Sequence, residues 1–210
     1  MDAGKLQRMK LFDGMTEGEI QQALRLLEAT ERRYQKGEVL LMAGSVTDKL
    51  GLVLEGSVTI ENNDDWGNRT IISHVGPGQV FAESYALTQQ EMLVDVTANE
   101  DSRIMFLRTG QGTEAWSVKY TLNLLRLSAQ KNLHLSARSF HTAPKTIRGR
   151  VMAYLHSVSV HAHSRTFTIP FDRQQLADYL NVERSALSKE LGKMQWEGLI
   201  TVRKSRFTIL

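Results

Sequence analysis

The hydrophobic pattern changes its period along the chain, and this feature constrains the fold more than any other. Over residues 31–107 apolar residues recur at about every second position, which is typical of strands with one buried face. Over residues 114–138 they recur every three or four positions without proline or glycine, which indicates one long helix. The rest of the chain mixes both periods. We therefore expect three parts, with boundaries at 1–113, 114–139 and 140–210.

Short apolar runs separated by glycines make up the β part. Strands spaced by about ten residues, with turn residues between them, favour an antiparallel sandwich or barrel. Thr16 and Glu19 form a capping box that predicts a short helix before the strands. Residues 62–68 are expected to be a hairpin tip. The candidate strands are 39–42, 50–54, 58–60, 70–72 and 103–107.

The absence of cysteine excludes whole classes of site. No disulfide, cysteine-ligated zinc or cysteine-ligated iron–sulfur cluster can form. We expect His161 and His163, with His156 upstream, to be an exposed helix end rather than a metal site, and the other histidines have no spacing typical of haem. The N-terminus has no apolar signal segment, and no apolar run approaches the roughly 18 residues of a membrane span. We therefore expect a cytoplasmic protein with no membrane partner.

Charge is distributed unevenly along the chain. Residues 1–139 carry 15 Lys and Arg against 18 Asp and Glu, whereas residues 140–210 carry 11 against 5. A compact basic part attached to a mildly acidic larger part indicates a domain that binds a polyanion and is governed by a separate domain. A solvated basic surface with no partner is the alternative.

Residues 173–191 have the pattern of a helix-turn-helix. Asp172 can cap the first helix, and Gln175 completes a capping box. Ala177 is small enough to let the two helices approach, and Asn181 tolerates the left-handed conformation of the turn. The residues expected to face inward are Leu176, Leu180, Leu187 and Leu191.

The order of elements beyond residue 140 is that of a winged helix. A helix at about 145–160 follows a loop at 141–144, and a strand at 166–170, the two helices and a hairpin of 199–202 with 207–210 complete it. Exposed basic side chains on the second helix can meet guanine acceptors in the major groove. The predicted DNA-binding residues are Arg173, Gln174, Arg184, Ser185, Ser188, Lys189, Lys204 and Arg206.

The long helix carries an apolar stripe whose spacing alternates between four and three, as in a short coiled coil. A polar residue in such a stripe can fix the register between two copies. The alternative is that the helix packs only on the β part. The predicted dimerisation residues are Val118, Leu122, Leu125, Ala129 and Asn132.

Together these features resemble the CRP/FNR family of bacterial transcription regulators over nearly the whole chain. Besides the winged helix, the resemblance rests on Gly37, Gly44, Gly56 and the run 76–83, Gly-Pro-Gly-Gln-Val-Phe-Ala-Glu. It implies an α+β fold: an N-terminal antiparallel β jelly-roll barrel of the cyclic-nucleotide-binding type, a long dimerisation helix and a C-terminal winged helix-turn-helix. The missing cysteines exclude the iron–sulfur oxygen sensors of the family.

In the family, the run matching 76–83 leads into a short helix that holds a nucleotide with backbone amides, a Glu and an Arg. Glu83 matches the ribose-binding Glu, Ala82 replaces the Gly of the phosphate turn, and Met92 stands where nucleotide-binding members have Arg. Without a guanidinium, a cyclic phosphate loses charge-assisted hydrogen bonds worth about 1.5–3 kcal/mol each. We therefore expect no cyclic nucleotide, and either a more apolar effector of unknown identity or an empty pocket. The predicted effector-binding residues are Phe81, Ala82, Glu83, Ser84, Met92 and Leu93.

The resemblance also assigns roles and partners. Arg184 matches a position that contacts a base edge, Ser185 stands where several members carry Glu, and Lys189 matches an Arg. The implied partners are double-stranded DNA with a palindromic operator, a second copy of the chain and RNA polymerase. An enzyme is not expected, because the chain has no Gly-x-Ser-x-Gly elbow, P-loop or His-Glu-x-x-His helix. A sensory or interaction module that does not bind DNA specifically is the alternative function.

Overall fold

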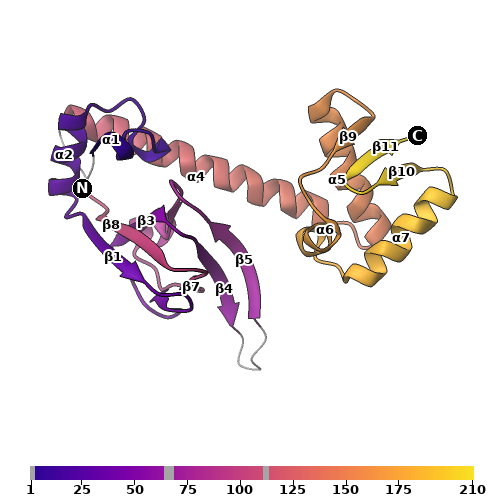
Figure 1. The fold of residues 1–210 in the computed structure, drawn as a ribbon, viewed down its shortest axis with the longest axis horizontal. Helices are drawn as coiled ribbons and strands as arrows, with labels where there is room; N and C mark the ends of the chain where they lie inside the picture. The colour runs from indigo at the N-terminus through magenta and orange to yellow at the C-terminus, as the bar shows by residue number, and fades with distance from the viewer. Residues whose placement is uncertain (1–2, 64–68, 111–113) are drawn as a thin grey trace. The chain divides into compact units, whose positions relative to one another are not determined.

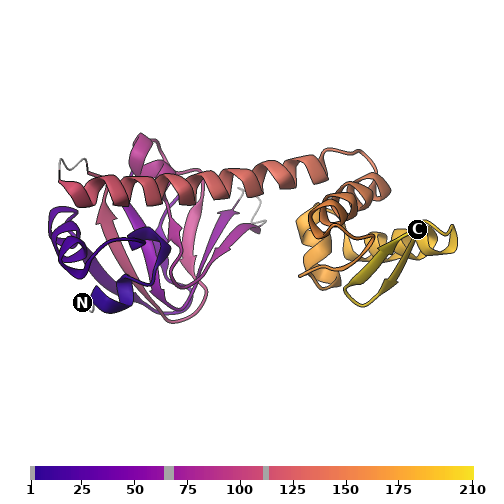
Figure 2. The same cartoon turned by 90° about the horizontal axis from the view of Figure 1, so that it is seen from above.

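The computed structural model describes residues 3–63, 69–110 and 114–210. Contacts divide the chain into two compact units, Met1–Gln130 and Lys131–Leu210 (Figure 1). The division falls within the long helix α4 (Ala115–Thr142), which is continuous (Figure 2). The first part of α4 therefore belongs to the first unit and its last part to the second.

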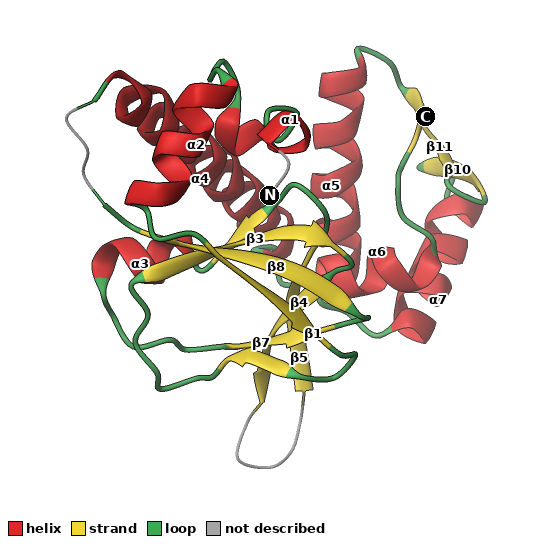
Figure 3. Cartoon of the chain, turned by 60° about the vertical axis from the view of Figure 1, so that its left-hand side comes forward, coloured by secondary structure: helices red, strands yellow, loops and turns green. Residues whose placement is uncertain are grey.

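Two antiparallel four-stranded sheets form the β part of the first unit (Figure 3). One has the order β1-β8-β3-β6 and the other the order β2-β7-β4-β5. The strands are β1 (Thr30–Tyr34), β2 (Val39–Leu41), β3 (Lys49–Glu55), β4 (Val58–Asn63), β5 (Arg69–Val75), β6 (Val80–Phe81), β7 (Asp95–Ala98) and β8 (Ser102–Arg108).

Alternation along β8 explains how both faces of its sheet are buried. Ile104 and Phe106 belong to the apolar cluster between the two sheets. Met105 and Leu107 belong to a second apolar cluster, which this sheet forms with the helices. Successive side chains of a strand point to opposite faces, so one strand contributes to two cores. Gly51 on β3 leaves room for the Phe81 ring, because a Cβ there would lie 2.1 Å from Phe81 Cζ.

Helices cover the outer face of the first sheet. Thr16 caps α2 (Glu17–Leu26), and the predicted capping box is present, with Thr16 N donating to Glu19 Oε2 at 2.8 Å. Trp116, Tyr120 and Leu124 of α4 pack in the same cluster. The remaining short helices of this unit are α1 (Ala3–Leu6), η1 (Lys10–Phe12) and α3 (Glu83–Thr88).

The second unit has the predicted element order of a winged helix. Its strands form an antiparallel sheet of order β10-β11-β9. The expected fold class, an antiparallel β jelly roll followed by a long helix and a winged helix-turn-helix, is confirmed, although the two sheets are not closed into one barrel. The elements are α5 (Ile147–Ala162), β9 (Thr166–Thr168), α6 (Arg173–Leu180), α7 (Arg184–Trp196), β10 (Ile200–Arg203) and β11 (Arg206–Ile209).

Some boundaries differ from the predictions. The long helix continues through His141 and Thr142, which were expected in a loop, and ends just before Pro144, since proline disfavours the helical conformation of the residue before it. Strand β9 ends at Thr168, two residues earlier than expected. The tip of the predicted hairpin lies in 64–68, outside the described residues; β4 and β5 pair on either side of it. Among the helices of the described ranges, none combines the length and the apolar composition that a membrane span requires.

Candidate DNA-binding and effector sites

The helix-turn-helix is built by local contacts that the sequence predicts. Asp172 Oδ1 accepts from Gln175 N at 2.8 Å, and Asp172 N donates to Gln175 Oε1 at 2.9 Å, which completes the capping box of α6. Asn181 ends that helix with φ 52° and ψ 55°, in the left-handed region. All four predicted leucines are buried: Leu176, Leu180, Leu187 and Leu191.

Because Leu187 and Leu191 form the buried side of α7, its other side faces solvent. Arg184, Ser185, Ser188 and Lys189 are all exposed there. Among them are a guanidinium fork and an ammonium, the groups that meet guanine O6 and N7 in the major groove. Helix α7 is the second helix of the motif and is called the recognition helix below.

The other predicted DNA-binding residues are spread over the second unit. Lys204 lies in the turn between β10 and β11 with φ 55°, and Arg206 is exposed at the start of β11. Gln174 donates to Asp178 Oδ1 at 2.8 Å, within α6. Arg173 is half-buried, and burial lowers its pKa. The recognition helix and the wing are therefore accessible to a ligand, whereas Arg173 is less accessible.

Two arginines that the sequence reading missed hold the motif together. Arg148 of α5 binds Glu190 on the recognition helix through Nε at 2.7 Å, and it binds Glu197, the C-cap of that helix, through Nη1 at 2.7 Å. These bonds raise the pKa of Arg148 and lower that of Glu197. Arg150 donates to the carbonyls of Pro144, Leu180 and Asn181 at 2.8–3.1 Å, which fixes the turn between the two helices.

A further set of contacts joins the end of α4 to α6 inside the second unit. Arg138 donates to the carbonyl oxygens of Asp178 at 2.9 Å and Tyr179 at 3.1 Å, which lie in the last turn of α6. A cation at a helix C-terminus is favourable because the carbonyls there lack intrahelical partners. His141 is buried, and its Nδ1 lies 2.8 Å from the Tyr179 hydroxyl. Burial lowers the pKa of His141.

The structure does not bring the six predicted effector residues onto one surface. Phe81 and Met92 are buried in the cluster between the sheets, and Met92 is only 2% exposed. Ala82 is the N-cap of α3 with φ 58°, a conformation that favours glycine, and Glu83 is buried beside it. Ser84 faces solvent, and Leu93 is 75% exposed.

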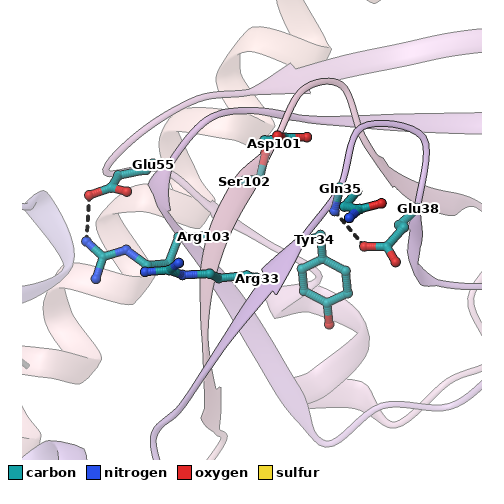
Figure 4. A pocket seen from close by; sticks show the side chains of 8 residues that line it. All are labelled: Arg33, Tyr34, Gln35, Glu38, Glu55, Asp101, Ser102 and Arg103. Atoms are coloured by element: carbon teal, nitrogen blue, oxygen red, sulfur yellow. Dashed lines mark hydrogen bonds and ion pairs between the residues drawn. The ribbon is translucent and has the colours of Figure 1, made fainter.

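A separate hollow of about 640 Å³ lies where the end of β1 meets the start of β8, and none of its lining residues is a predicted effector residue (Figure 4). Arg103 of β8 binds Glu31 on β1 at 3.3 Å and Glu55 on β3 at 2.7 Å. The Arg103 guanidinium holds the pKa of Glu55 below its usual range. The residues around the hollow are Arg33, Tyr34, Gln35, Glu38, Glu55, Asp101, Ser102 and Arg103.

Helix α4 has two apolar faces. Trp116, Tyr120 and Leu124 are buried against the first unit, whereas Val118 and Leu125 are each 62% exposed. The five predicted dimerisation residues, Val118, Leu122, Leu125, Ala129 and Asn132, are all exposed and are called the seam below.

The histidines do not form a metal site in the described part of the chain, where no group of three or more His, Asp or Glu could hold an ion. His156, His161 and His163 are exposed near the end of α5, as the sequence reading expected. His74 Nδ1 lies 3.1 Å from the Thr59 hydroxyl.

Comparison with known families matches both parts of the chain. Residues 31–114 match the cyclic nucleotide-binding domain, and residues 149–210 match the Crp-like helix-turn-helix domain. The fold and the exposed recognition helix define a winged-helix regulator joined to a β domain of the cyclic nucleotide-binding type. The chain belongs to the CRP/FNR family, whose members are transcription regulators and not enzymes.

Individual relatives are distant. The chain is 21% identical over 197 residues to the transcriptional activator protein FnrL of Cereibacter sphaeroides, covering 85% of this chain and 75% of that protein. It is 28% identical over 97 residues to the cyclic AMP receptor protein of Thermus thermophilus, a match that spans 46% of this chain and 44% of that one.

Solved structures share the fold. A complex of CprK with OCPA has a TM-score of 0.62 at 14% identity, covering 89% of this chain and 88% of that one. The c-di-GMP responsive global regulator CLP of Xanthomonas campestris has a TM-score of 0.56 at 19% identity, covering 92% of this chain and 99% of that one.

Proposed function

We propose that this regulator is a homodimer in the cytoplasm that binds a palindromic DNA operator through the recognition helix and the wing. In this proposal residues 1–113 sense an effector, 114–139 dimerise and 140–210 bind DNA. The observation that carries it is the exposed side of the recognition helix, where Arg184, Ser185, Ser188 and Lys189 lie together.

Charge supports the proposal. Residues 140–210 carry 11 basic against 5 acidic residues, and such an excess of positive charge favours the phosphate contacts that hold a protein on DNA regardless of sequence. The wing residues Lys204 and Arg206 are exposed and can serve that role. Arg184, at the first position of the recognition helix, can contact base edges, which is where sequence is distinguished.

The seam supports a dimer. The alternative, in which α4 packs only on the β part, accounts for Trp116, Tyr120 and Leu124 but leaves Leu122 and Leu125 exposed to water. Two copies joined along this stripe would cover them on both chains, as in a coiled coil. A two-fold axis would also present two recognition helices to half-sites about 34 Å apart.

The first unit is proposed to respond to an effector other than cyclic AMP or cyclic GMP. This proposal rests on the resemblance, in which Met92 matches the phosphate-binding Arg, and it is supported by the burial of the apolar Met92 side chain in the cluster between the sheets. RNA polymerase is proposed as the further protein partner.

Selection from a pool of random duplex DNA with the full chain tests the proposal. We expect enrichment of a palindrome, a steep decrease in affinity with salt and a dimer by light scattering at micromolar concentration. Binding with no enriched sequence would instead support the alternative function, a sensory or interaction module without specific DNA binding.

A further inference from the structure

The recognition helix begins with an uncommon N-cap. Ser, Thr, Asp and Asn are the preferred residues at this position, because their short side chains reach the free N–H groups of the first turn. Here the N-cap is Glu183, which is exposed and accepts from Ala186 N at 2.9 Å through Oε2. The same oxygen also accepts from the Ser185 hydroxyl. One carboxylate oxygen therefore holds both the helix terminus and a candidate base-contacting side chain.

This contact fixes the direction of the Ser185 hydroxyl. An ionised carboxylate can only accept hydrogen bonds, and a serine hydroxyl has one hydrogen and two lone pairs. The bonds from Ser185 and from Ala186 N hold the pKa of Glu183 below its usual range, so the group is ionised at neutral pH. Ser185 is consequently the donor, and its hydroxyl has only lone pairs left to offer to a ligand.

The major groove distinguishes donors from acceptors. Adenine N6 and cytosine N4 are amino donors, whereas guanine N7 and O6 and thymine O4 are acceptors. A serine hydroxyl that is free to rotate can contact either kind of base, but one whose hydrogen is already used can contact only a donor. An acceptor placed opposite it would leave both the serine oxygen and the base acceptor atom without a hydrogen.

We propose that Glu183 is a positioning residue that makes Ser185 an obligate hydrogen-bond acceptor, so that the half-site carries adenine or cytosine on the strand that Ser185 contacts. The inference rests on the proposed function, because it assumes that the recognition helix enters the major groove. It deepens that function by assigning the class of base at one position.

The alternative role of Glu183 is to cap the helix and nothing else, and two substitutions separate the roles. Glu183→Gln keeps one amide oxygen that can accept from both Ser185 and Ala186, and it removes the charge. Glu183→Ser also removes the charge and is a preferred cap, but its side chain is too short to hold the Ser185 hydroxyl. Both variants lose the same negative charge near DNA, so comparing them cancels that effect.

The experiment is selection on a randomised half-site with the full chain, followed by affinity measurements on the four bases at each position. Ser185→Ala identifies the position, because discrimination there is lost. For the wild type we expect adenine or cytosine to be preferred there by about tenfold over guanine and thymine, as a misplaced acceptor costs a hydrogen bond. We expect Glu183→Gln to keep this preference and Glu183→Ser to reduce it to about twofold or less. Thermal unfolding of each variant controls for folding.

Each other result overturns the inference. If Glu183→Ser keeps the wild-type preference, Glu183 only caps the helix. If Glu183→Gln loses the preference as fully as Glu183→Ser does, the charge and not the hydrogen bond is responsible. If the wild type prefers guanine or thymine at the Ser185 position, Ser185 is a donor. If the wild type enriches no sequence at all, the proposed function fails together with the inference.

Discussion

At the scale of single residues, the recognition helix and the wing predict different DNA-binding defects. Arg184 is the first residue of the recognition helix and is exposed. Its guanidinium can donate hydrogen bonds to guanine O6 and N7 at the same time. Arg184→Ala should weaken binding to the selected site by about 1–3 kcal/mol and relax sequence preference. Lys204→Ala in the wing, the matched control, should weaken binding to selected and random DNA by the same factor and reduce the salt slope. Competition titrations measure both, and equal losses on the two DNAs for Arg184→Ala would contradict its base-contacting role.

His141 predicts how the second unit responds to acid. It is buried against Tyr154 and Tyr179, with Arg138 bound to the backbone nearby, and burial lowers its pKa from the ordinary value of 6.5. As the pH falls, the His141 side chain is therefore protonated at a higher pH in the unfolded chain than in the folded chain. The stability that the neutral ring contributes is complete above about pH 6.5 and is lost as the pH falls toward the folded-state pKa.

Calorimetry of the full chain between pH 7.5 and 5.5 should therefore show a smaller loss of thermal stability in His141→Gln than in the wild type. His134→Gln is the control, because His134 is exposed on the same helix. If His141→Gln loses as much thermal stability as the wild type over this pH range, other groups are responsible for the acid sensitivity.

Residue positions that depend on local sequence could be predicted, and those that depend on distant partners could not. Asp172 with Gln175, and Thr16 with Glu19, are pairs three residues apart whose geometry the helix start fixes. Arg148 contacts Glu190 across 42 positions, and nothing in the sequence marks those two charges as partners. The effector residues were matched to a family pattern, but burial of Phe81 and exposure of Leu93 depend on how the sheets pack.

At the scale of elements, the hydrophobic pattern predicts the strands that carry apolar runs, but it does not predict β7 (Asp-Val-Thr-Ala), whose alternation between half-buried and buried residues covers only four positions. It missed β1, whose sequence Thr-Glu-Arg-Arg-Tyr is almost wholly exposed and has no apolar alternation. Strand β1 lies at the edge of its sheet and is held by its backbone pairing with β8. Strand β6 has two residues and is too short to show a period. The long helix was predicted because its apolar spacing persists over many turns.

The seam on α4 predicts the oligomeric state. Leu122→Glu with Leu125→Glu places like charges opposite each other across a two-fold axis, where they would be desolvated. The double variant should be a monomer by light scattering and should bind the operator poorly. Gln130→Glu is the control, because Gln130 is exposed on α4 outside the seam and should leave the dimer intact. A wild type that is monomeric at micromolar concentration and still binds with full affinity would contradict the scheme.

In the molecule as a whole, an effector can change DNA binding only if it binds two conformations with different affinities, one that binds DNA and one that does not. Helix α4 contributes Trp116 and Tyr120 to the core of the first unit and Arg138 and His141 to contacts within the second. It is therefore the element able to couple the two. The interior between the sheets is occupied by Phe81, Phe106 and Met92, so a ligand there would have to displace apolar side chains.

This packing predicts how the protein responds to cyclic nucleotides. A cyclic phosphate keeps its negative charge, and Met92, which the resemblance places at the position of the usual guanidinium, is only 2% exposed among apolar residues. Burying an unpaired charge there is costly, and the charge-assisted hydrogen bonds that would offset the cost are missing. Titration calorimetry with cyclic AMP and with cyclic GMP should show no binding tighter than about millimolar, or about 4 kcal/mol.

The same preparation must bind the selected operator, which shows that the protein is folded and active. Micromolar binding of either nucleotide, accompanied by tighter operator binding, would mean that backbone amides at the start of α3 suffice for the phosphate and that Met92 moves aside.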